Sequence, residues 1–342
     1  MRNSAGFLLP RWPHEYSGKA AMHYTKPALT FEQQADQLLA RGLVANRNEL
    51  IRRLEAVNYY RLSGYLYPFR VLPTHTFTLG TTLTTVWRRY NFDRRLRILL
   101  LDAIERIEVS VRTRLVYHFS HVHGPFGHLD ESNLPGFKKL SGFKRLEKNL
   151  KSLFKGKGIA RSDHQNWLER LYRETQRAAG SEVFVKHFRS NYGDKHDALP
   201  LWMACELMTC GVVLEFINTV GPTIQKQVAA DFGFPDQQLL SWTKAIFTLR
   251  NTCAHHSRIW NRVFGVKPSV PGKNKNPQWH SVPAFDNDRI GLLMTVCHHW
   301  LKQISSTTQW KVRLFHLFDE YPEIPLADMG IPAGWRTHSL WL

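Results

Sequence analysis

The residues best suited to chemistry lie in one polar segment that follows an apolar stretch. The segment runs Thr248-Leu-Arg-Asn-Thr-Cys-Ala-His-His-Ser-Arg-Ile-Trp-Asn-Arg262. A histidine whose pKa lies near neutrality can take a proton from a hydroxyl group or give one to a leaving oxygen. An arginine can hold a phosphate whose negative charge grows in the transition state. Arg250 and His255 would therefore suffice, without a metal, to drive attack of an RNA 2′-hydroxyl on the adjacent phosphorus.

This reaction would leave a 2′,3′-cyclic phosphate and a 5′-hydroxyl, and it would spare DNA, which lacks the nucleophile. We expect one helix to carry the groups. Residues three or four apart share a stripe on a helix, and the stripe here would hold Asn251, His255, Arg258 and Arg262. Arg250 and His255 would lie about 140° apart. The long arginine side chain could still reach round to a phosphate held near His255.

Other roles remain open for several of these residues. His255 could be an interior histidine whose ring nitrogens are satisfied, and His256 is as much a structural as a functional candidate. Arg258 could pair with Glu206 or Glu105 and hold two helices together.

A zinc site is the obvious rival for the histidines and cysteines, which include His255, His256, His298, His299, Cys253 and Cys297. No Cys-x-x-Cys or His-Glu-x-x-His spacing occurs. Adjacent histidines on a helix diverge by about 100°, so one ion cannot easily take both. No Walker-type glycine-rich loop and no Gly-x-Ser-x-Gly sequence occurs either. We therefore expect no metal and no cofactor.

The charge of the chain points to a polyanionic partner. Its 342 residues include 46 Lys and Arg against 28 Asp and Glu, a formal net charge of +18. This excess favours nucleic acid first and an anionic membrane surface second. No stretch is expected to span a bilayer, because the most apolar one, Leu199 to Val220, carries Glu206 and Glu215.

Two basic stretches could contact phosphates. The first extends from Lys138 to Arg161, and its candidate RNA-binding residues are Lys138, Lys139, Lys144, Arg145, Lys148, Lys151, Lys155 and Lys157. The second, Phe264–Pro283, contains Lys267, Lys273 and Lys275 and is the weaker candidate. A solvated loop remains the alternative for each.

Helical periodicity predicts an all-α fold. Thr30 and Asn46 are expected to cap two helices, of which the second should end near Gly64. One long helix should run from about Thr82 to His121. Further helices are expected near 163–178, 182–190, 200–220, 223–232, 236–261, 287–304 and 308–319. Only Thr74–Thr85 carries a strand signal, as a short hairpin.

The four cysteines are too few and too scattered for a disulfide framework. Reduced thiols are the simplest interpretation, and they favour a soluble cytoplasmic protein. The N-terminal residues are not expected to form a signal peptide, because Pro10 and Pro13 interrupt a short apolar run.

The polar segment also resembles a known family. Leu249-Arg-Asn-Thr-Cys-Ala-His-His-Ser-Arg-Ile-Trp-Asn261 is similar to the signature of the Abi-like abortive-infection proteins, a branch of the HEPN superfamily. Three further blocks resemble the family in order and spacing: Asn58-Tyr-Tyr-Arg-Leu-Ser-Gly-Tyr65, Leu101-Asp-Ala-Ile-Glu-Arg-Ile-Glu-Val109 and Leu199-Pro-Leu-Trp-Met-Ala-Cys-Glu206. Together the blocks span roughly Tyr24 to Trp300.

The resemblance implies a HEPN-type helical bundle with additional N-terminal and C-terminal helices, and a metal-independent endoribonuclease. Arg250 and His255 match the catalytic pair, and Asn251 matches the polar residue between them. His256, Arg258 and Asn261 belong to the same block as possible auxiliary residues. The resemblance also implies a homodimer whose two motifs face each other, and a role in anti-phage defence or as a toxin restrained by an RNA or protein antitoxin.

On this basis the chain divides into a flexible tail at 1–22, a single domain at 23–320 and a C-terminal tail at 321–342. Within the domain we expect N-terminal helices at 30–120, a basic connecting segment at 121–161 and the catalytic helices at 162–305. Two other functions stay open. The chain could be a non-catalytic RNA-binding protein that uses the same basic surface, or a helical scaffold that binds proteins.

Overall fold

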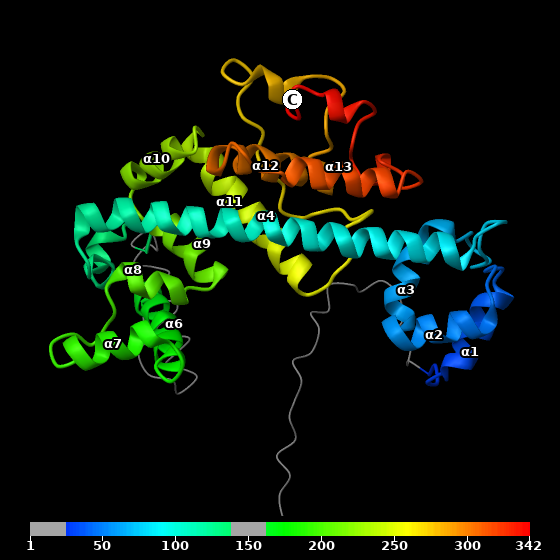
Figure 1. The fold of residues 1–342 in the computed structure, drawn as a ribbon, viewed down its shortest axis with the longest axis horizontal. Coiled ribbons are helices and arrows are strands. Elements are labelled where there is room, and N and C mark those ends of the chain that lie inside the picture. The colour runs from blue at the N-terminus through cyan, green and yellow to red at the C-terminus, as the bar shows by residue number, and fades with distance from the viewer. Residues whose placement is uncertain (1–24, 138–161) are drawn as a thin grey trace, which may run out of the picture. The chain divides into compact units, whose positions relative to one another are not determined.

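The computed structural model of the chain describes residues 25–137 and 162–342. Over these residues the fold is all-α, with two isolated β-bridges and no strand, which confirms the expected fold class (Figure 1). The chain forms two compact units, Met1–Val86 and Trp87–Leu342. No helix among the described residues is long and apolar enough to cross a membrane.

The first unit begins with the two capped helices that the sequence predicts. Thr30 caps α1 (Phe31–Ala40) through a capping box with Gln33. Asn46 caps α2 (Arg47–Val57) by accepting a hydrogen bond from the backbone N–H of Glu49. Local sequence was therefore sufficient to place both helix starts.

The expected end of the second helix near Gly64 is wrong. Asn58 adopts a positive φ of 66°, which ends α2, and its side chain accepts from the backbone N–H of Tyr60 to start α3 (Tyr59–Leu66). Asparagine tolerates this backbone region better than most residues. The hairpin predicted at Thr74–Thr85 is also wrong: an isolated antiparallel bridge joins Arg70 and Phe77, and turns follow it.

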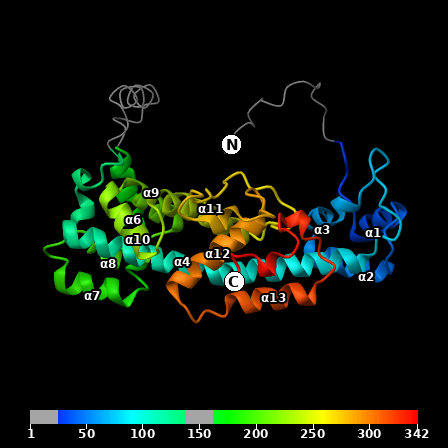
Figure 2. The same ribbon diagram turned by 90° about the horizontal axis from the view of Figure 1, so that it is seen from above.

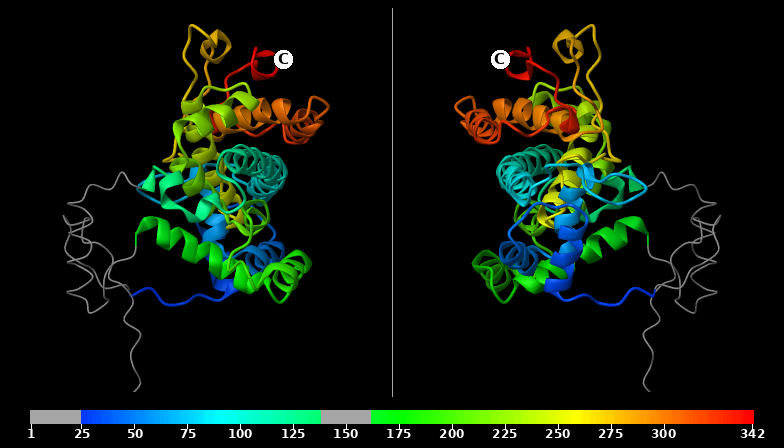
Figure 3. Two further views of the ribbon diagram at one scale, coloured as in Figure 1. Left: turned by 90° about the vertical axis from the view of Figure 1, so that its left-hand side faces the viewer. Right: turned by 90° about the vertical axis from the view of Figure 1, so that its right-hand side faces the viewer.

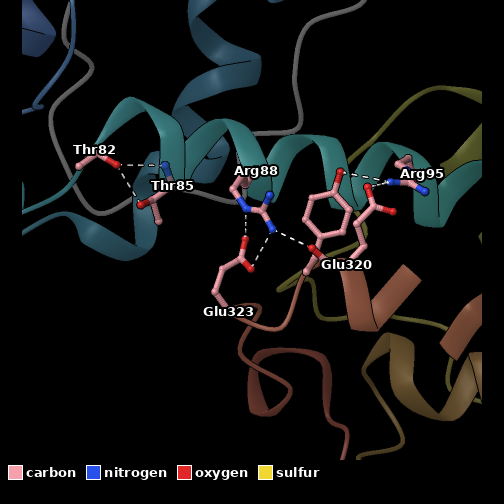
Figure 4. Close-up of polar contacts among 7 residues, drawn as sticks. Thr82, Thr85, Arg88, Arg95, Glu320 and Glu323 are labelled. Carbon is pink, nitrogen blue, oxygen red and sulfur yellow. Dashed lines mark hydrogen bonds and ion pairs between the residues drawn. The ribbon is translucent and has the colours of Figure 1, made fainter. Parts of the chain in front are cut away.

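The predicted long helix is confirmed as α4 (Leu83–His123). Its first turn is capped locally, because the Thr82 hydroxyl accepts from the backbone N–H of Thr85 at 3.1 Å (Figure 4). A fully buried stripe continues along the helix at helical spacing, and its members include Leu96, Leu100, Ile104, Ile107, Val111 and Leu115.

The first half of α4 lies beside α13 (Trp310–Glu320) (Figures 1 and 3). Arg88 pairs with Glu323 and Arg95 with Glu320 (Figure 4). The indole N–H of Trp310 donates to the carbonyl oxygen of Leu99 at 2.8 Å. The neighbouring α12 (Ile290–Ile304) is almost wholly buried, so this side of α4 is covered.

The segments that precede α11 lie around the second half of α4 (Figure 2), where Arg112 pairs with Glu206 and Arg114 with Asp231. These segments are α6 (Asp163–Ala178), α7 (Val183–Tyr192), α8 (Leu201–Ala204), α9 (Cys210–Thr219) and α10 (Pro222–Asp231). The single helix expected at 200–220 is interrupted after η5 (Cys205–Leu207), because extended Thr209 caps α9 by accepting from Val212. The helix α11 (Asp236–Ala254) follows.

Residues 321–342 pack within the second unit. Trp335 and Trp341 are buried. The Trp341 ring stacks on His298 at 4.7 Å, and its indole N–H donates to the Thr295 hydroxyl at 3.1 Å. The end of the chain therefore covers α12.

Buried His298 predicts a loss of stability in acid. Burial lowers the pKa of its imidazole from 6.5 to about 4, and the positive charges of Lys302 and Lys311 contribute to this shift. As the pH falls, the unfolded chain therefore binds a proton at this histidine before the folded chain does. The free energy of unfolding is unaffected above about pH 6.5 and decreases as the pH drops toward 4, by at most about 3 kcal/mol. His298→Phe keeps a ring against Trp341 but cannot titrate. Urea unfolding over this pH range should show a smaller loss for His298→Phe than for wild type.

Exposed His316 on α13 supplies the control. His316→Phe should follow the wild-type pH dependence. An equal loss in wild type and His298→Phe would assign the acid sensitivity to other groups.

Candidate functional site

The polar segment begins on α11 but leaves the helix earlier than expected. The helix ends at Ala254, His255 is its C-cap, and His256 has a positive φ of 56°. The predicted helix to residue 261 is therefore wrong, and Arg258 and Arg262 do not continue a helical stripe. Asn251 and His255 keep their relation, because the backbone N–H of His255 donates to the carbonyl oxygen of Asn251 at 3.0 Å.

The structure brings Arg250, Asn251 and His255 together at the C-terminal end of α11. Asn251 and His255 are exposed, and Arg250 is half-buried. Nη1 of Arg250 lies 3.5 Å from Oδ1 of Asn251. The arginine therefore bends toward the side of the helix that carries Asn251.

Helices α4 and α9 supply the surroundings of Arg250. The thiol of Cys210, at the start of α9, donates to Oε2 of Glu108 on α4 at 3.0 Å. Burial, and to a smaller extent this hydrogen bond, raises the pKa of Cys210 to about 12. The positive charge of nearby Arg250 opposes the rise. The thiol thus stays neutral, and no carboxylate in the described parts of the chain forms an ion pair with Arg250.

A buried carboxylate fixes the chain that follows the helix. Asp93 has no exposed surface, and its Oδ1 accepts from the backbone N–H groups of Ile259 at 3.1 Å and Trp260 at 2.7 Å. Its Oδ2 pairs with Arg97, one turn later on α4. Nη1 of Arg97 also lies 3.5 Å from the carbonyl oxygen of Ser257. The return of the chain after His255 is therefore tied to α4.

Sequence reasoning missed Asp93, Arg97, Glu108 and Cys210. A signal did exist for the first pair: Asp93 and Arg97 stand four residues apart beside the apolar positions Phe92 and Leu96, which are fully buried. Charged residues among core positions of a helix are rarely buried unless paired. Nothing in the sequence places Cys210 beside Glu108, because 102 residues separate them.

The possible auxiliary residues take different places. His256 is exposed in its left-handed turn. The guanidinium of Arg258 lies 6.0 Å from the centre of the Trp260 ring, and Glu206, one of its suggested partners, pairs with Arg112 at 3.0 Å. Oδ1 of Asn261 accepts from Arg289 at 3.1 Å, which ties it to the start of α12.

The candidate RNA-binding lysines and arginine between Lys138 and Lys157 lie outside the described residues. The second basic stretch is described: Lys273 and Lys275 are exposed, and Lys267 pairs with Asp288 at 3.2 Å. Among the described residues, no group of three or more His, Cys, Asp or Glu side chains is arranged to hold a metal ion. The four cysteines are free and buried.

Comparison with known proteins gives one match. A family model described as Abi-like protein matches residues 52–261. This range begins in α2 and ends at Asn261, so it includes Arg250, Asn251 and His255. No curated protein and no solved structure matches the chain.

Asp93 is predicted to be a major source of stability. Asp93→Ala removes the carboxylate that pairs with buried Arg97 and frees two backbone N–H groups, which should lower the free energy of unfolding by about 3–5 kcal/mol. Asp102, on the same helix, provides a matched control because its pair with Arg313 is partly exposed. Asp102→Ala should cost at most about 1 kcal/mol. Urea unfolding of both variants tests this difference, and equal losses would contradict it.

Proposed function

Because the chain belongs to the Abi-like protein family, we propose that it is a metal-independent endoribonuclease that acts in abortive infection of phage-infected cells or as the toxin of a toxin–antitoxin system. Membership of the family supports a defence role, and the side chains at the end of α11 support the reaction. The proposal rests on one observation: Arg250 bends toward Asn251 at the exposed helix end that also carries His255.

The reaction can be written with these groups. His255 takes the proton of a ribose 2′-hydroxyl, and the 2′-oxygen attacks the adjacent phosphorus. The bond from phosphorus to the 5′-oxygen breaks, and the leaving oxygen takes a proton from an imidazolium or from water. Arg250 stabilises the charge on the phosphorane oxygens. The amide of Asn251 holds the guanidinium in place.

The exposure of the site suits a large substrate and a second copy of the chain. An RNA phosphate can approach the end of α11 directly, since Asn251 and His255 are exposed. In a symmetric homodimer, the histidine of one protomer and the arginine of its partner could share one phosphate. A nuclease with so open a site needs restraint, which an RNA or protein antitoxin would provide.

Cleavage by purified protein in EDTA tests the assignment. Arg250→Ala and His255→Ala should each lower the cleavage rate by about 10²–10⁴-fold, the usual contribution of acid–base and charge-stabilising groups. Asn251→Ala should lower it less. A substrate with one 2′-deoxyribose at the cut should resist cleavage there, and the products should carry 2′,3′-cyclic phosphate ends.

Arg177 on α6 and His316 on α13 are exposed and supply matched controls. Arg177→Ala and His316→Ala should cut at the wild-type rate. Wild-type cutting by an Arg250→Ala, His255→Ala double variant would overturn the site. Salt-dependent binding without cutting by wild type would instead favour the non-catalytic RNA-binding function.

The basic stretch 138–161 is proposed to capture RNA through its charge. Replacing Lys144, Lys148, Lys151 and Lys155 by glutamine, in a His255→Ala background that does not cut, should weaken binding. The slope of log affinity against log salt should become shallower by up to about 3, since each phosphate contact on a single strand adds about 0.7.

Exposed lysines elsewhere in the chain supply the control for charge alone. They are Lys186, Lys195, Lys226 and Lys302. Replacing these four by glutamine should change the slope less. An equal change in the two variants would show that the net charge, and not this stretch, captures RNA.

A further inference from the structure

A groove of about 520 Å³ lies between the second half of α4 and the α8–η5 segment. Its lining includes Thr113, Tyr117, Ser120 and His121 from α4, and Trp202 and Glu206 from α8 and η5. The volume lies in the range of small-ligand pockets. The groove belongs wholly to the second unit, and neither the family match nor the reaction above assigns it a role.

Two aromatic side chains in the lining of this groove are about half exposed. Tyr117 is 57% exposed and Trp202 is 49% exposed, although large aromatic residues are usually covered. The ring of Tyr117 lies against His121 with centroids 4.2 Å apart, which steadies it. Exposed aromatic faces of this kind are the platforms on which proteins stack unpaired bases of single-stranded RNA.

Polar groups in the lining suit the edge of a base. The hydroxyl of Ser120 is buried and has no hydrogen-bond partner in the described structure. A buried hydroxyl without a partner is costly, and it can donate to or accept from a ligand. The carboxylate of Glu206 is held by Arg112 at 3.0 Å and retains acceptor capacity for an exocyclic amino group.

The groove also lies on the same helix as the surroundings of Arg250. Glu108, which accepts the thiol of Cys210 beside Arg250, precedes Tyr117 on α4 by about 14 Å along the helix axis and by about 180° around it. Arg112 stands between them. A single strand of RNA at Arg250 would therefore reach the groove by passing partly round α4 as well as along it.

We propose that the groove is a nucleobase-binding subsite, in which Tyr117 and Trp202 stack an unpaired base of the RNA that flanks the cut and Ser120 and Glu206 contact its edge. The choice of RNA as the ligand rests on the proposed function. The formal net charge of +18 supports RNA over an apolar peptide as the occupant. The subsite would give the nuclease a base preference at a fixed distance from the cleaved bond.

A fluorescent base locates the contact without requiring cleavage. RNA oligonucleotides that carry 2-aminopurine at successive positions are bound to His255→Ala protein. Stacking should quench one position, and that position should keep a fixed distance from the wild-type cut. Tyr117→Ala and Trp202→Ala should each abolish the quenching and weaken binding by about tenfold. Tyr117→Phe and Trp202→Phe, which keep a ring, should retain both.

Tyr172 on α6 is 52% exposed and supplies the matched control: Tyr172→Ala should bind and quench like the parent protein. Both alanine variants remove exposed side chains, and thermal melting confirms that they fold. Unchanged quenching and affinity in Tyr117→Ala and Trp202→Ala overturn the subsite, as does an RNA that leaves every position unquenched. Quenching that depends on both rings in a protein that never cuts would instead support the subsite and reject the nuclease.

Discussion

The carboxylate of Asp93 accepts hydrogen bonds from the backbone N–H groups of Ile259 and Trp260 and forms an ion pair with Arg97. Asp93 has no exposed surface. A buried charge is tolerated only when hydrogen bonds surround it. The chain after α11 must therefore return to one place on α4. That return fixes where α11 can end, and His255 stands at this end. The position of the proposed catalytic histidine thus depends on a residue far from it in sequence.

The environment of Arg250 follows from the same helix. Glu108 on α4 engages the Cys210 thiol, and burial keeps this thiol protonated by raising its pKa to about 12. A thiolate here would neutralise the arginine and compete with a phosphate for it. The neutral thiol holds α4 and α9 together without that competition. The charge that the proposed reaction needs is therefore preserved by a neighbour that takes no part in the chemistry.

The sequence was most informative where structure is decided locally. Capping residues such as Thr30 and Asn46 placed helix starts, and an apolar stripe without proline or glycine identified α4. The errors fall at Asn58, Thr209 and Ala254, where helices end inside helical patterns. At Asn58 and Thr209 the side chain caps the next helix. After Ala254 the chain is held by Asp93, which accepts from the backbone N–H groups of Ile259 and Trp260. Arg250, Asn251 and His255 could be named from the sequence, but their supports could not, because contacts such as Asp93–Trp260 join distant positions.

The two faces of α4 differ in how much their side chains contribute to stability. Toward α12 and α13 the helix presents buried apolar side chains and ion pairs, so change there costs stability. Toward α8 and η5 it presents Tyr117 and an unpartnered hydroxyl at Ser120, which add little to stability. Side chains that neither cover a core nor complete a hydrogen-bond network are free to serve a ligand. A rigid helix that carries both the supports of Arg250 and this groove would hold the cut and the recognised base at a fixed separation, without any moving part.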